Sequence, residues 1–378
     1  MAKKAIAEKA LLLHKKLGGK IRIMPAIEVK DRTALSLVYT PGVAAVSSLL
    51  AENKKQARDY TIKGKMIAVI SDGSAVLGLG NIGPYGALPV MEGKCALFKI
   101  FAGVDAFPIV LDTQEPEEII ETIVRIAPAF GGINLEDIAA PKCFYIEEEL
   151  KSRLDIPVMH DDQHGTAIAV LAALINAAKS VRKDLKKLKI VISGAGAAGT
   201  AVAKLLLKSG VKDIIVLDSS GIISGDRKEK HKKKLARNTN PRKISGGLRA
   251  ALCGADAFVG VSGPGLLRTN DVRTMAPRAI VFAMANPVPE IMPEEAVEGG
   301  AAVIGTGRSD YPNQINNSLV FPGVFRGALK NRIAKITDEM KLRAARNLAA
   351  LVKNPTSRKI VPGPFEKGVA EAVSRAIR

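Results

Sequence analysis

Residues 185–221 read LKKLKIVISGAGAAGTAVAKLLLKSGVKDIIVLDSSG, and this stretch decides the fold. It runs as an apolar strand, a glycine turn, an amphipathic helix, a second apolar strand and an acidic residue. Outside it, further strand-like runs occur at 65–70, 106–112, 256–263, 279–287 and 301–307. Helical patterns separate most of these runs. Such alternation predicts an α/β protein whose parallel sheets are covered by helices on both faces, with a Rossmann-type doubly wound sheet in the second half.

The glycine turn predicts binding of a dinucleotide. It consists of Gly194, Ala195, Gly196, Ala197, Ala198 and Gly199. The turn follows a strand and opens a helix, which is the context that this fingerprint requires. The first glycine allows the tight turn, the second lets a pyrophosphate approach the backbone, and the third lets helix and strand pack closely. The helix N-terminus then offers unpaired N–H groups to the phosphates.

Asp218 bears on which nicotinamide cofactor is used. It ends the second strand, 24 residues after Gly194. An acidic side chain there accepts hydrogen bonds from the ribose hydroxyls and repels a 2′-phosphate, which favours NAD. NADP stays open, because Arg227 and Lys228 follow and could fold back to neutralise a phosphate.

Length and composition predict two domains with aliphatic cores. The chain has 378 residues, 47% of them hydrophobic, only 4% aromatic and none of them tryptophan. A buried helix is expected from about Asp161 onward. We therefore expect a substrate and metal domain at 1–160 and a cofactor domain at 161–378, with C-terminal helices packing back.

The terminal segment and the cysteines favour a soluble, cytoplasmic protein. Residues 1–19 alternate lysines with Ala and Leu at helical spacing, which predicts an amphipathic helix capped by Gly18 and Gly19 rather than a signal peptide. The chain offers no run of about 18 consecutive apolar residues. Three scattered cysteines form neither a disulfide framework nor a zinc pattern, so a reducing compartment fits best.

The formal charge of +19 raises nucleic acid as a partner. Part of the excess lies in the basic segment 226–243, DRKEKHKKKLARNTNPRK. This segment has no interleaved aromatic residues for stacking on bases, and the chain shows no RNA-recognition, zinc-finger or helix-turn-helix signature. We expect a solvated face and no specific nucleic acid.

Two acidic pairs are candidate metal ligands. Asp161 and Asp162 lie between His160 and His164, and they either bind a metal or cap the following helix. Glu136 and Asp137, in GGINLEDIAAP, serve one site together only if they lie at a strand end or in a loop. Carboxylate ligands with little cysteine favour Mg²⁺ or Mn²⁺ over zinc.

Two further residues stand in segments that look built for more than packing. Tyr39 lies beside a Pro-Gly turn in VYTPGVA, and Lys94 follows a glycine in MEGKCALFK. Taken singly, such a tyrosine is usually an anchoring core residue, and a lone lysine usually lies on a solvated face.

Together these segments resemble the malic enzyme family, close to its short prokaryotic members. The resemblance spans nearly the whole chain. It is carried by VYTPGVA, SDGSAVLGLGNIGPYGALPVMEGKCALFK, INLEDIAAPKCF, HDDQHGTA, GAGAAG, MANPVPE and IGTGRSDYPNQINNSLVFPG.

The resemblance implies an enzyme that oxidises and decarboxylates L-malate to pyruvate and CO₂ with NAD, as a homodimer. It implies these roles: Glu136, Asp137 and Asp162 as metal ligands, Lys94 as general base, Tyr39 as general acid, Asp161 as a residue that orients the base or a ligand, and Asn286 and Asn317 as contacts of substrate or nicotinamide. A base near neutrality needs the pKa of Lys94 to fall well below its ordinary value, by burial or by a nearby positive charge.

The chain departs from the family at one point. Larger members carry an arginine that binds the substrate carboxylate, whereas this chain has Val104 and Asp105 there, so another cation has to meet that carboxylate. Three other functions remain open. A malolactic enzyme or a metal-dependent oxaloacetate decarboxylase needs nearly the same residues, and a basic NAD-sensing or nucleic-acid-binding protein without activity needs only the charge and the glycine turn.

Overall fold

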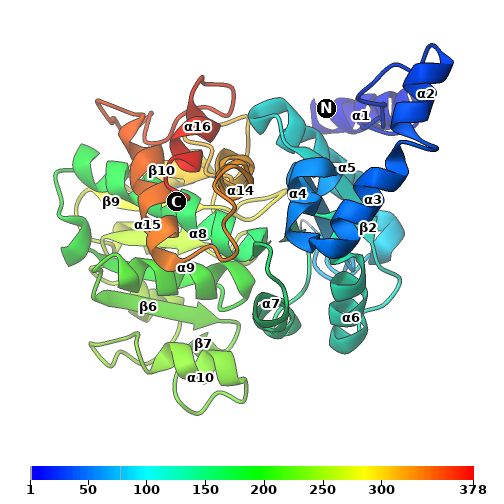
Figure 1. Cartoon of the computed structure of the whole chain (residues 1–378). Coiled ribbons are helices and arrows are strands. Elements are labelled where there is room, and N and C mark those ends of the chain that lie inside the picture. Colours follow the sequence, from blue (N-terminus) through cyan, green and yellow to red (C-terminus); the bar gives the residue numbers. More distant parts are fainter. Residues whose placement is uncertain (1, 77) are drawn as a thin grey trace.

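In the computed structural model, which describes residues 2–76 and 78–378, the strands form two sheets (Figure 1). The first has the order β2-β1-β3-β4 and the second the order β10-β9-β8-β5-β6-β7. Every pairing is parallel except that of β6 with the short β7. The fold is thus α/β with a doubly wound second sheet, as the sequence predicts.

The first sheet and its helices are built from residues up to His160. Their bounds are α1 Ala2–Leu17, α2 Arg32–Val38, α3 Val43–Glu52, α4 Ala57–Tyr60, β1 Met66–Ser71, α5 Gly83–Ala102, β2 Asp105–Val110, α6 Pro116–Ile126, β3 Gly132–Leu135, α7 Lys142–Arg153 and β4 Val158–His160, with 3₁₀ turns η1 Lys54–Gln56, η2 Ile62–Gly64 and η3 Ala127–Ala129. The strands predicted at 65–70 and 106–112 are confirmed as β1 and β2.

The second sheet and the C-terminal helices follow. Their bounds are α8 Asp161–Ser180, η4 Leu185–Lys187, β5 Lys189–Ser193, α9 Ala197–Lys208, β6 Asp213–Asp218, β7 Gly221–Ile222, α10 Lys230–Ala236, α11 Leu248–Leu252, β8 Ala257–Gly260, α12 Thr269–Arg273, β9 Ala279–Ala283, α13 Pro293–Glu298, β10 Ala301–Thr306, η5 Asn317–Leu319, α14 Phe321–Lys330, α15 Asp338–Ala350 and α16 Val369–Ser374. The helices after β10 pack back, because α15 lies on α8, and α14 and α16 contact α5.

Helix α8 joins the two halves. Its first residue directly follows the end of β4, and most of the helix is buried against α9 and α15. One continuous apolar core includes Ile67 of β1, Ile168 of α8 and Ile190 of β5. The alanine-rich sequence of α8 explains this position, because small side chains let neighbouring helices approach closely.

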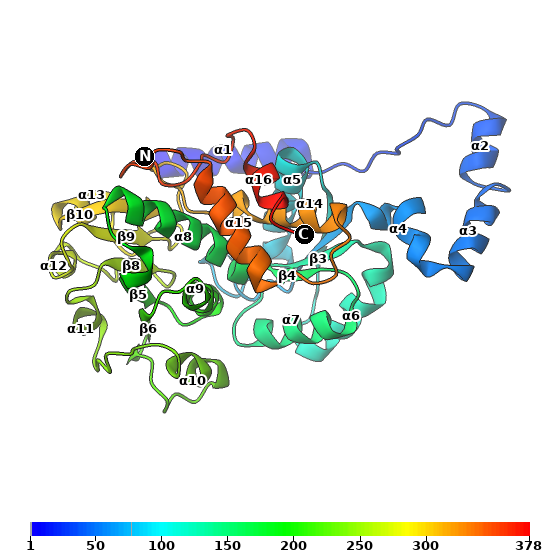
Figure 2. The same cartoon turned by 60° about the vertical axis from the view of Figure 1, so that its left-hand side comes forward.

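The N-terminal elements form an arm that leaves the body of the molecule. Helix α1 ends at Gly18, whose φ of 62° confirms the predicted glycine cap. Figure 2 shows α2 and α3 at the outer end of the arm, beyond α4. We call residues Arg32–Glu52, which form α2, its turn and α3, the arm tip. All of its residues are exposed or half-exposed.

The arm tip bears on the prediction that the chain has no apolar run long enough to span a membrane. Its 21 residues are long and apolar enough, by length and composition, to cross a membrane, although the sequence contains no uninterrupted apolar run of that length. In the structure, however, these residues form two helices of 7 and 10 residues on either side of a turn. Each of the two helices is shorter than the roughly 20 residues that a spanning helix requires.

Candidate functional site

Four acidic side chains meet at the carboxyl ends of β3 and β4, which are neighbours in the first sheet. Glu136 and Asp137 directly follow β3, at the strand end that the sequence analysis required, and Asp161 and Asp162 form the first turn of α8. Ligand oxygens of Glu136, Asp137 and Asp162 all lie within 4.8 Å of one another. Crevices at the carboxyl ends of parallel strands are where open α/β sheets bind ligands.

Hydrogen bonds of ordinary length hold two of these carboxylates in place. The backbone N–H of Asp137 donates to Asp162 Oδ2 at 2.9 Å, and Asn134 Nδ2 donates to Glu136 Oε2 at 3.0 Å. Asp161 and Asp162 lie inside the first turn of α8, and the N-cap position is His160, which makes no side-chain cap hydrogen bond. Asn134 carries no motif, which is why the sequence analysis missed it.

Lys94 of α5 points into this acidic group. Its Nζ lies 2.5 Å from Asp161 Oδ2 and also pairs with Glu136. The ring of Phe321, at the start of α14, lies 4.4 Å from the same nitrogen, a cation–π contact. Lys94 is buried, so the ordinary expectation of a solvated lysine does not hold here. We call Lys94, Glu136, Asp137, Asp161 and Asp162 the acidic cluster.

Burial and charge set the proton affinities of the acidic cluster. Burial lowers the pKa of Lys94, but the carboxylates of Asp161, Glu136 and Asp162 outweigh it and hold that pKa above its ordinary value. This direction is opposite to the one that a base near neutrality needs. Burial raises the pKa of Asp161 to about 6 and, together with the charge of Asp162, raises that of Glu136 well above its usual range.

The structure also shows where the two predicted asparagines lie. Asn317 begins η5, which packs on α8 so closely that a Cβ on Gly165 would lie 3.1 Å from Asn317 Cβ and 1.8 Å from Asp161 Oδ1. Asn317 is therefore a neighbour of the acidic cluster. Asn286 follows β9 and lies between the halves, because a Cβ on Gly78 would meet its carbonyl oxygen at 2.1 Å.

Tyr39 is not brought to the acidic cluster of its own chain. It lies in the turn of the arm tip and is 67% exposed. In Figure 2 the arm tip lies on the far side of α4 from β3 and β4. Within one chain, Tyr39 therefore lies outside the acidic cluster and is exposed to solvent.

The glycine turn has the three properties that its fingerprint implies. Gly194 has a φ of +116°, and a Cβ there would meet the carbonyl oxygen of Val261 at 2.6 Å. A Cβ on Gly199 would meet the carbonyl oxygen of Gly194 at 1.7 Å, whereas a Cβ on Gly196 would meet no described atom within 4 Å. The turn also lies between β5 and β8, where the second sheet reverses its strand order. This geometry leaves open space at the middle glycine for a phosphate group.

Asp218 is engaged by two cations. Arg227 donates Nε and Nη2 to its two carboxylate oxygens, both at 3.1 Å, and Lys232 Nζ lies 3.0 Å away. Burial raises the pKa of Asp218, but hydrogen bonds from Lys232, Ser220 and Arg227 outweigh it and lower that pKa below the ordinary value. Arg227 thus folds back as the sequence suggests, whereas Lys228 is exposed and the second cation is Lys232 of α10.

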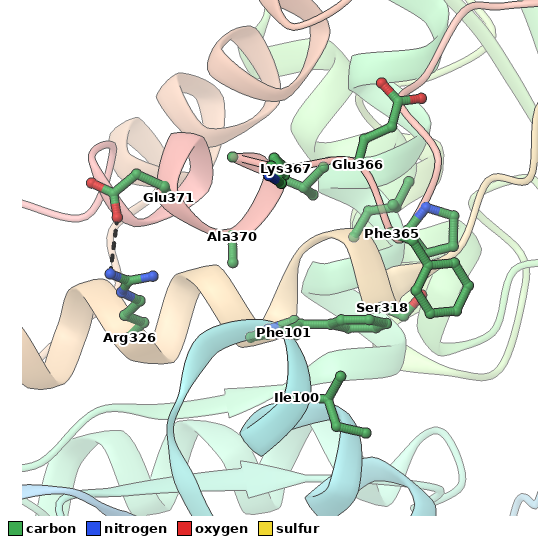
Figure 3. A pocket seen from close by; sticks show the side chains of 14 residues that line it. Ile100, Phe101, Ser318, Arg326, Phe365, Glu366, Lys367, Ala370 and Glu371 are labelled. Atoms are coloured by element: carbon green, nitrogen blue, oxygen red, sulfur yellow. Dashed lines mark ion pairs between the residues drawn. The ribbon is translucent and has the colours of Figure 1, made fainter.

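A surface pocket of about 300 Å³ lies elsewhere, at the C-terminal end of α5. Figure 3 shows Phe101 and Phe365 facing each other, with ring centroids 5.7 Å apart, and the ion pair of Arg326 with Glu371 at 3.1 Å. Its fourteen lining residues, all of them described, include no residue predicted for the site. The acidic cluster and the glycine turn therefore remain the candidate site.

Comparison with known proteins agrees with this geometry. Residues 18–151 match the family described as "Malic enzyme, N-terminal domain", and residues 163–375 match "Malic enzyme, NAD binding domain". The chain is 54% identical over 376 residues to the NAD-dependent malic enzyme of Geobacillus stearothermophilus, which covers 98% of this chain and 78% of the relative. It is 52% identical to the bifunctional malic/malolactic enzyme of Bacillus subtilis, which covers 99% of this chain and 92% of the relative.

Solved structures give the same result. The crystal structure of an NAD-dependent malic enzyme from Thermotoga maritima matches with a TM-score of 0.94 and 49% identity, covering 97% of this chain and 98% of that one. Some other relatives are named NADP-dependent malic enzymes. The chain belongs to the malic enzyme family and is an enzyme with that family's NAD-binding domain.

Proposed function

We propose that this enzyme oxidatively decarboxylates L-malate to pyruvate and CO₂, with reduction of NAD and with a divalent cation, Mg²⁺ or Mn²⁺. The observation that carries the proposal is the buried contact of Lys94 with a group of four carboxylates. Such a group fits a reaction in which a hydroxyl proton is removed beside a cation that binds the substrate oxygens.

The donor set fits a hard divalent cation. Three carboxylates converge, and the acidic cluster as a whole holds four carboxylates against the single ammonium of Lys94, among the described residues. The raised pKa of Glu136 has burial and neighbouring charge as its causes, and a cation would relieve the second. Glu136, Asp137 and Asp162 would hold the ion. When bound, it supplies Lewis acidity at the malate oxygens, as the nicotinamide supplies a hydride acceptor.

The residues of the chain then have these roles in the proposal. Lys94 takes the proton of the C2 hydroxyl of malate, and Asp161, 2.5 Å from its Nζ, positions the amine and shares that proton. A further positive charge at Glu136 and Asp162 would counter the carboxylates that raise the pKa of Lys94, so that the neutral amine becomes accessible near neutral pH. Asn286 and Asn317 orient substrate and cofactor. Tyr39 returns a proton to C3 after decarboxylation.

For the cofactor we propose NAD as the preferred form. Asp218 offers its carboxylate to the ribose hydroxyls, and the relative from Geobacillus stearothermophilus is named NAD-dependent. Arg227 and Lys232 are the cations on hand for a 2′-phosphate, so NADP is expected to be a weaker substrate rather than an excluded one.

The test is formation of NADH from L-malate with Mn²⁺ or Mg²⁺, with and without a chelator. We expect turnover that the chelator abolishes and that returning the metal restores. Unchanged turnover after chelation would defeat the role of the metal, and absence of turnover would defeat the proposal.

The relative from Bacillus subtilis supports a second candidate activity, because its name includes malolactic enzyme. Product analysis distinguishes the two. Pyruvate with one NADH per malate supports oxidative decarboxylation, whereas lactate without net NADH supports the malolactic reaction.

We also propose a cytoplasmic location and no specific nucleic-acid partner. The three cysteines are free. Within the basic segment, Arg227 and Lys232 pair with Asp218, and Arg242 pairs with Asp213 at 2.9 Å, which supports a structural use of these charges.

A further inference from the structure

A pocket of about 590 Å³ lies between helices of the two halves. Residues of α7 from the first half line it together with residues of α8, α9, α10 and α15, which Figure 1 labels. The described residues of this lining include none of the acidic cluster and none of the glycine turn. Its volume lies within the range of roughly 300–1,000 Å³ that is typical of small-molecule sites. We call it the lysine pocket.

Lysines outnumber acids in the lining of this pocket. Five ammonium groups meet three carboxylates there, namely Lys151, Lys204, Lys208, Lys234 and Lys341 with Glu147, Glu148 and Asp338. Glu147 is already paired with Lys151 at 2.7 Å. Asp338 is paired with Lys341 at 3.1 Å and also with Lys208. The lysine pocket thus keeps an excess of positive charge, which favours an anion as its occupant.

Lys204 of α9 and Lys234 of α10 are the ammonium groups left for that occupant. Within residues 2–76 and 78–378, no acid forms an ion pair with either of them, and Lys204 Nζ lies 5.7 Å from the ring centroid of Phe144. Burial and the charge of Lys234 lower the pKa of Lys204, although Glu148 opposes them. Because the two ammonium groups repel each other, an anion that lies between them is stabilised by both.

A buried polar network fixes one part of the lining. Lys341 of α15 is only 5% exposed, and its Nζ lies 3.1 Å from Nδ1 of His164 in α8. The Nε2 atom of the same histidine lies 2.9 Å from Oε2 of Glu147 in α7. Three helices that line the lysine pocket are therefore held together before any ligand arrives, which lowers the cost of ordering the site on binding.

Apolar side chains supply the rest of the surface. They are Phe144, Ala167, Ala201, Leu205, Leu207 and Leu235. An inorganic anion would leave this surface uncovered, whereas an organic anion buries an apolar body against it. A mostly apolar lining with a few charged groups is the usual composition of a site for an organic ligand.

We propose that the lysine pocket binds a small organic phosphate, with the phosphate group on Lys204 and Lys234 and the apolar body against Phe144 and Leu205. A phosphate monoester carries about two negative charges at neutral pH, which matches the two ammonium groups. Lysine binds phosphate as a flexible point charge. The inference goes beyond the proposed function and does not depend on it.

The position of the lysine pocket gives its occupant access to both halves and to the acidic cluster. Gln163 and His164 line the pocket and directly follow Asp161 and Asp162 in the first turn of α8. An organic phosphate there contacts helices of both halves within one helical turn of two carboxylates of the acidic cluster. The lysine pocket is therefore placed to act as an effector site rather than as a second substrate site.

Phenyl phosphate is the probe that tests the proposal, because it joins an apolar ring to a doubly charged phosphate. Its binding is measured by calorimetry on the full chain saturated with NAD, so that the glycine turn is already occupied. We expect saturable binding to the wild type. Lys204→Gln combined with Lys234→Gln is expected to weaken it by about tenfold or more, because two charge-assisted contacts are lost. Phenol, which lacks the phosphate, is expected to bind about tenfold more weakly or worse.

Lys233→Gln is the matched control. Lys233 is an exposed lysine of the same helix, α10, but it does not line the lysine pocket. We expect this variant to bind phenyl phosphate as the wild type does, and both variants to keep the wild-type melting temperature and affinity for NAD. Absence of binding to the wild type, unchanged affinity in the double variant, or an equal loss in Lys233→Gln would each overturn the proposal. No malate is present, so failure here is distinct from failure of the proposed function.

A second measurement locates the bound phosphate. Lysines are acetylated with acetic anhydride in the presence and absence of phenyl phosphate, and the extent of labelling of each peptide is read by mass spectrometry. The lowered pKa of Lys204 leaves more of its amine neutral and therefore reactive. We expect phenyl phosphate to slow the labelling of Lys204 and Lys234 several-fold and to leave that of Lys233 unchanged. Equal protection of all three lysines, or protection of none, would contradict the assignment.

Discussion

The residue that links most of the proposed chemistry is Lys94. Its ammonium is buried and contacts Asp161, Glu136 and the ring of Phe321, so its proton affinity is set by a balance of charges around it rather than by solvent. The sequence indicates the lysine through the resemblance. The sequence does not show whether the pKa of Lys94 is raised or lowered. The direction of this shift depends on Glu136 and Asp161, which are 42 and 67 residues away in the chain.

Replacing Lys94 with Ala is expected to lower malate oxidation by about 10²–10⁴-fold, the usual contribution of a general base. Binding of NAD, measured by calorimetry, is expected to be unchanged, because the glycine turn belongs to the other sheet. Lys99→Ala is the control on the same helix, since that lysine is exposed and pairs with Asp105. Retained turnover in Lys94→Ala would remove the residue from its proposed role.

Asp218 is the residue that we expect to set the preference between NAD and NADP. Replacing it with Ala removes an acceptor for the ribose hydroxyls and frees Arg227 and Lys232 for a 2′-phosphate. A hydrogen bond to a charged group contributes about 1.5–3 kcal/mol. We therefore expect the ratio of kcat/KM for NADP to that for NAD to rise by about 10–100-fold. Asp213→Ala, at the other end of β6, should leave the ratio unchanged.

At the scale of elements, the glycine turn between β5 and α9 has separable structural and binding positions. A methyl group at Gly199 would overlap the carbonyl oxygen of Gly194, whereas one at Gly196 would meet open space. The first change strains the packing of strand and helix. The second, with φ at −83°, leaves the backbone unstrained but occupies the space where a pyrophosphate approaches.

We therefore expect Gly196→Ala to keep the wild-type melting temperature and to lose NAD affinity by at least an order of magnitude, because its methyl group fills the phosphate space. Gly199→Ala is expected to lower the melting temperature by several degrees, which corresponds to about 1–3 kcal/mol of overpacking. Thermal unfolding and a cofactor titration measure the two effects. The assignment of positions fails if Gly196→Ala binds NAD normally.

Local pattern predicts most elements of this fold, and long-range contacts explain what it misses. The strands at 65–70 and 106–112, observed as β1 and β2, follow from periodicity alone. Helix α8 begins at Asp161, as the sequence predicts, but its packing against α9 and α15 does not follow from the local pattern. The position of the arm tip cannot be predicted from local pattern, because the sequence of a short helix does not indicate where that helix packs.

The same limit applies to the site. Each acidic pair is visible in the sequence, but Asp137 and Asp162 are 25 positions apart, so the sequence does not show the hydrogen bond that joins them. Phe321 and Lys232 belong to no sequence motif. A phenylalanine at the start of a helix and a lysine in a basic segment are both common, so neither residue indicates a site. Only the fold brings Phe321 to Lys94 and Lys232 to Asp218.

At the scale of the whole molecule, an ion pair attaches the C-terminal helix α15 to helix α9 of the cofactor sheet. Asp338, in the first turn of α15, pairs with Lys208 at the end of α9 and with Lys341 at 3.1 Å. Burial raises the pKa of Asp338, but these two lysines outweigh it and lower the pKa to about 2. The pair with Lys208 thus joins α15 to α9, whereas the pair with Lys341 lies within α15.

The pKa of Asp338 predicts the pH range of this contribution. Because the folded-state pKa lies below the unfolded value of about 3.9, the stabilisation is complete above pH 4 and is lost as pH falls toward 2. Asp338→Asn is expected to lower the free energy of unfolding at pH 6 by on the order of 0.5–1 kcal/mol, since the pair is half-exposed. The difference should shrink at pH 3. Equal effects at both pH values, or an equal effect of the neighbouring Glu339→Gln, would contradict the assignment.

Helix α8 has the geometry of a lever arm whose first turn carries Asp161 and Asp162 of the acidic cluster. Its 20 residues extend about 30 Å from Asp161 into the cofactor half. A rotation of about 10° about its first turn would carry the far end through roughly 5 Å, yet Asp162, one residue from the pivot, would move by a small fraction of that distance. A rotation of that size would change the reach from the glycine turn to Lys94 far more than it would change the spacing of Glu136, Asp137 and Asp162.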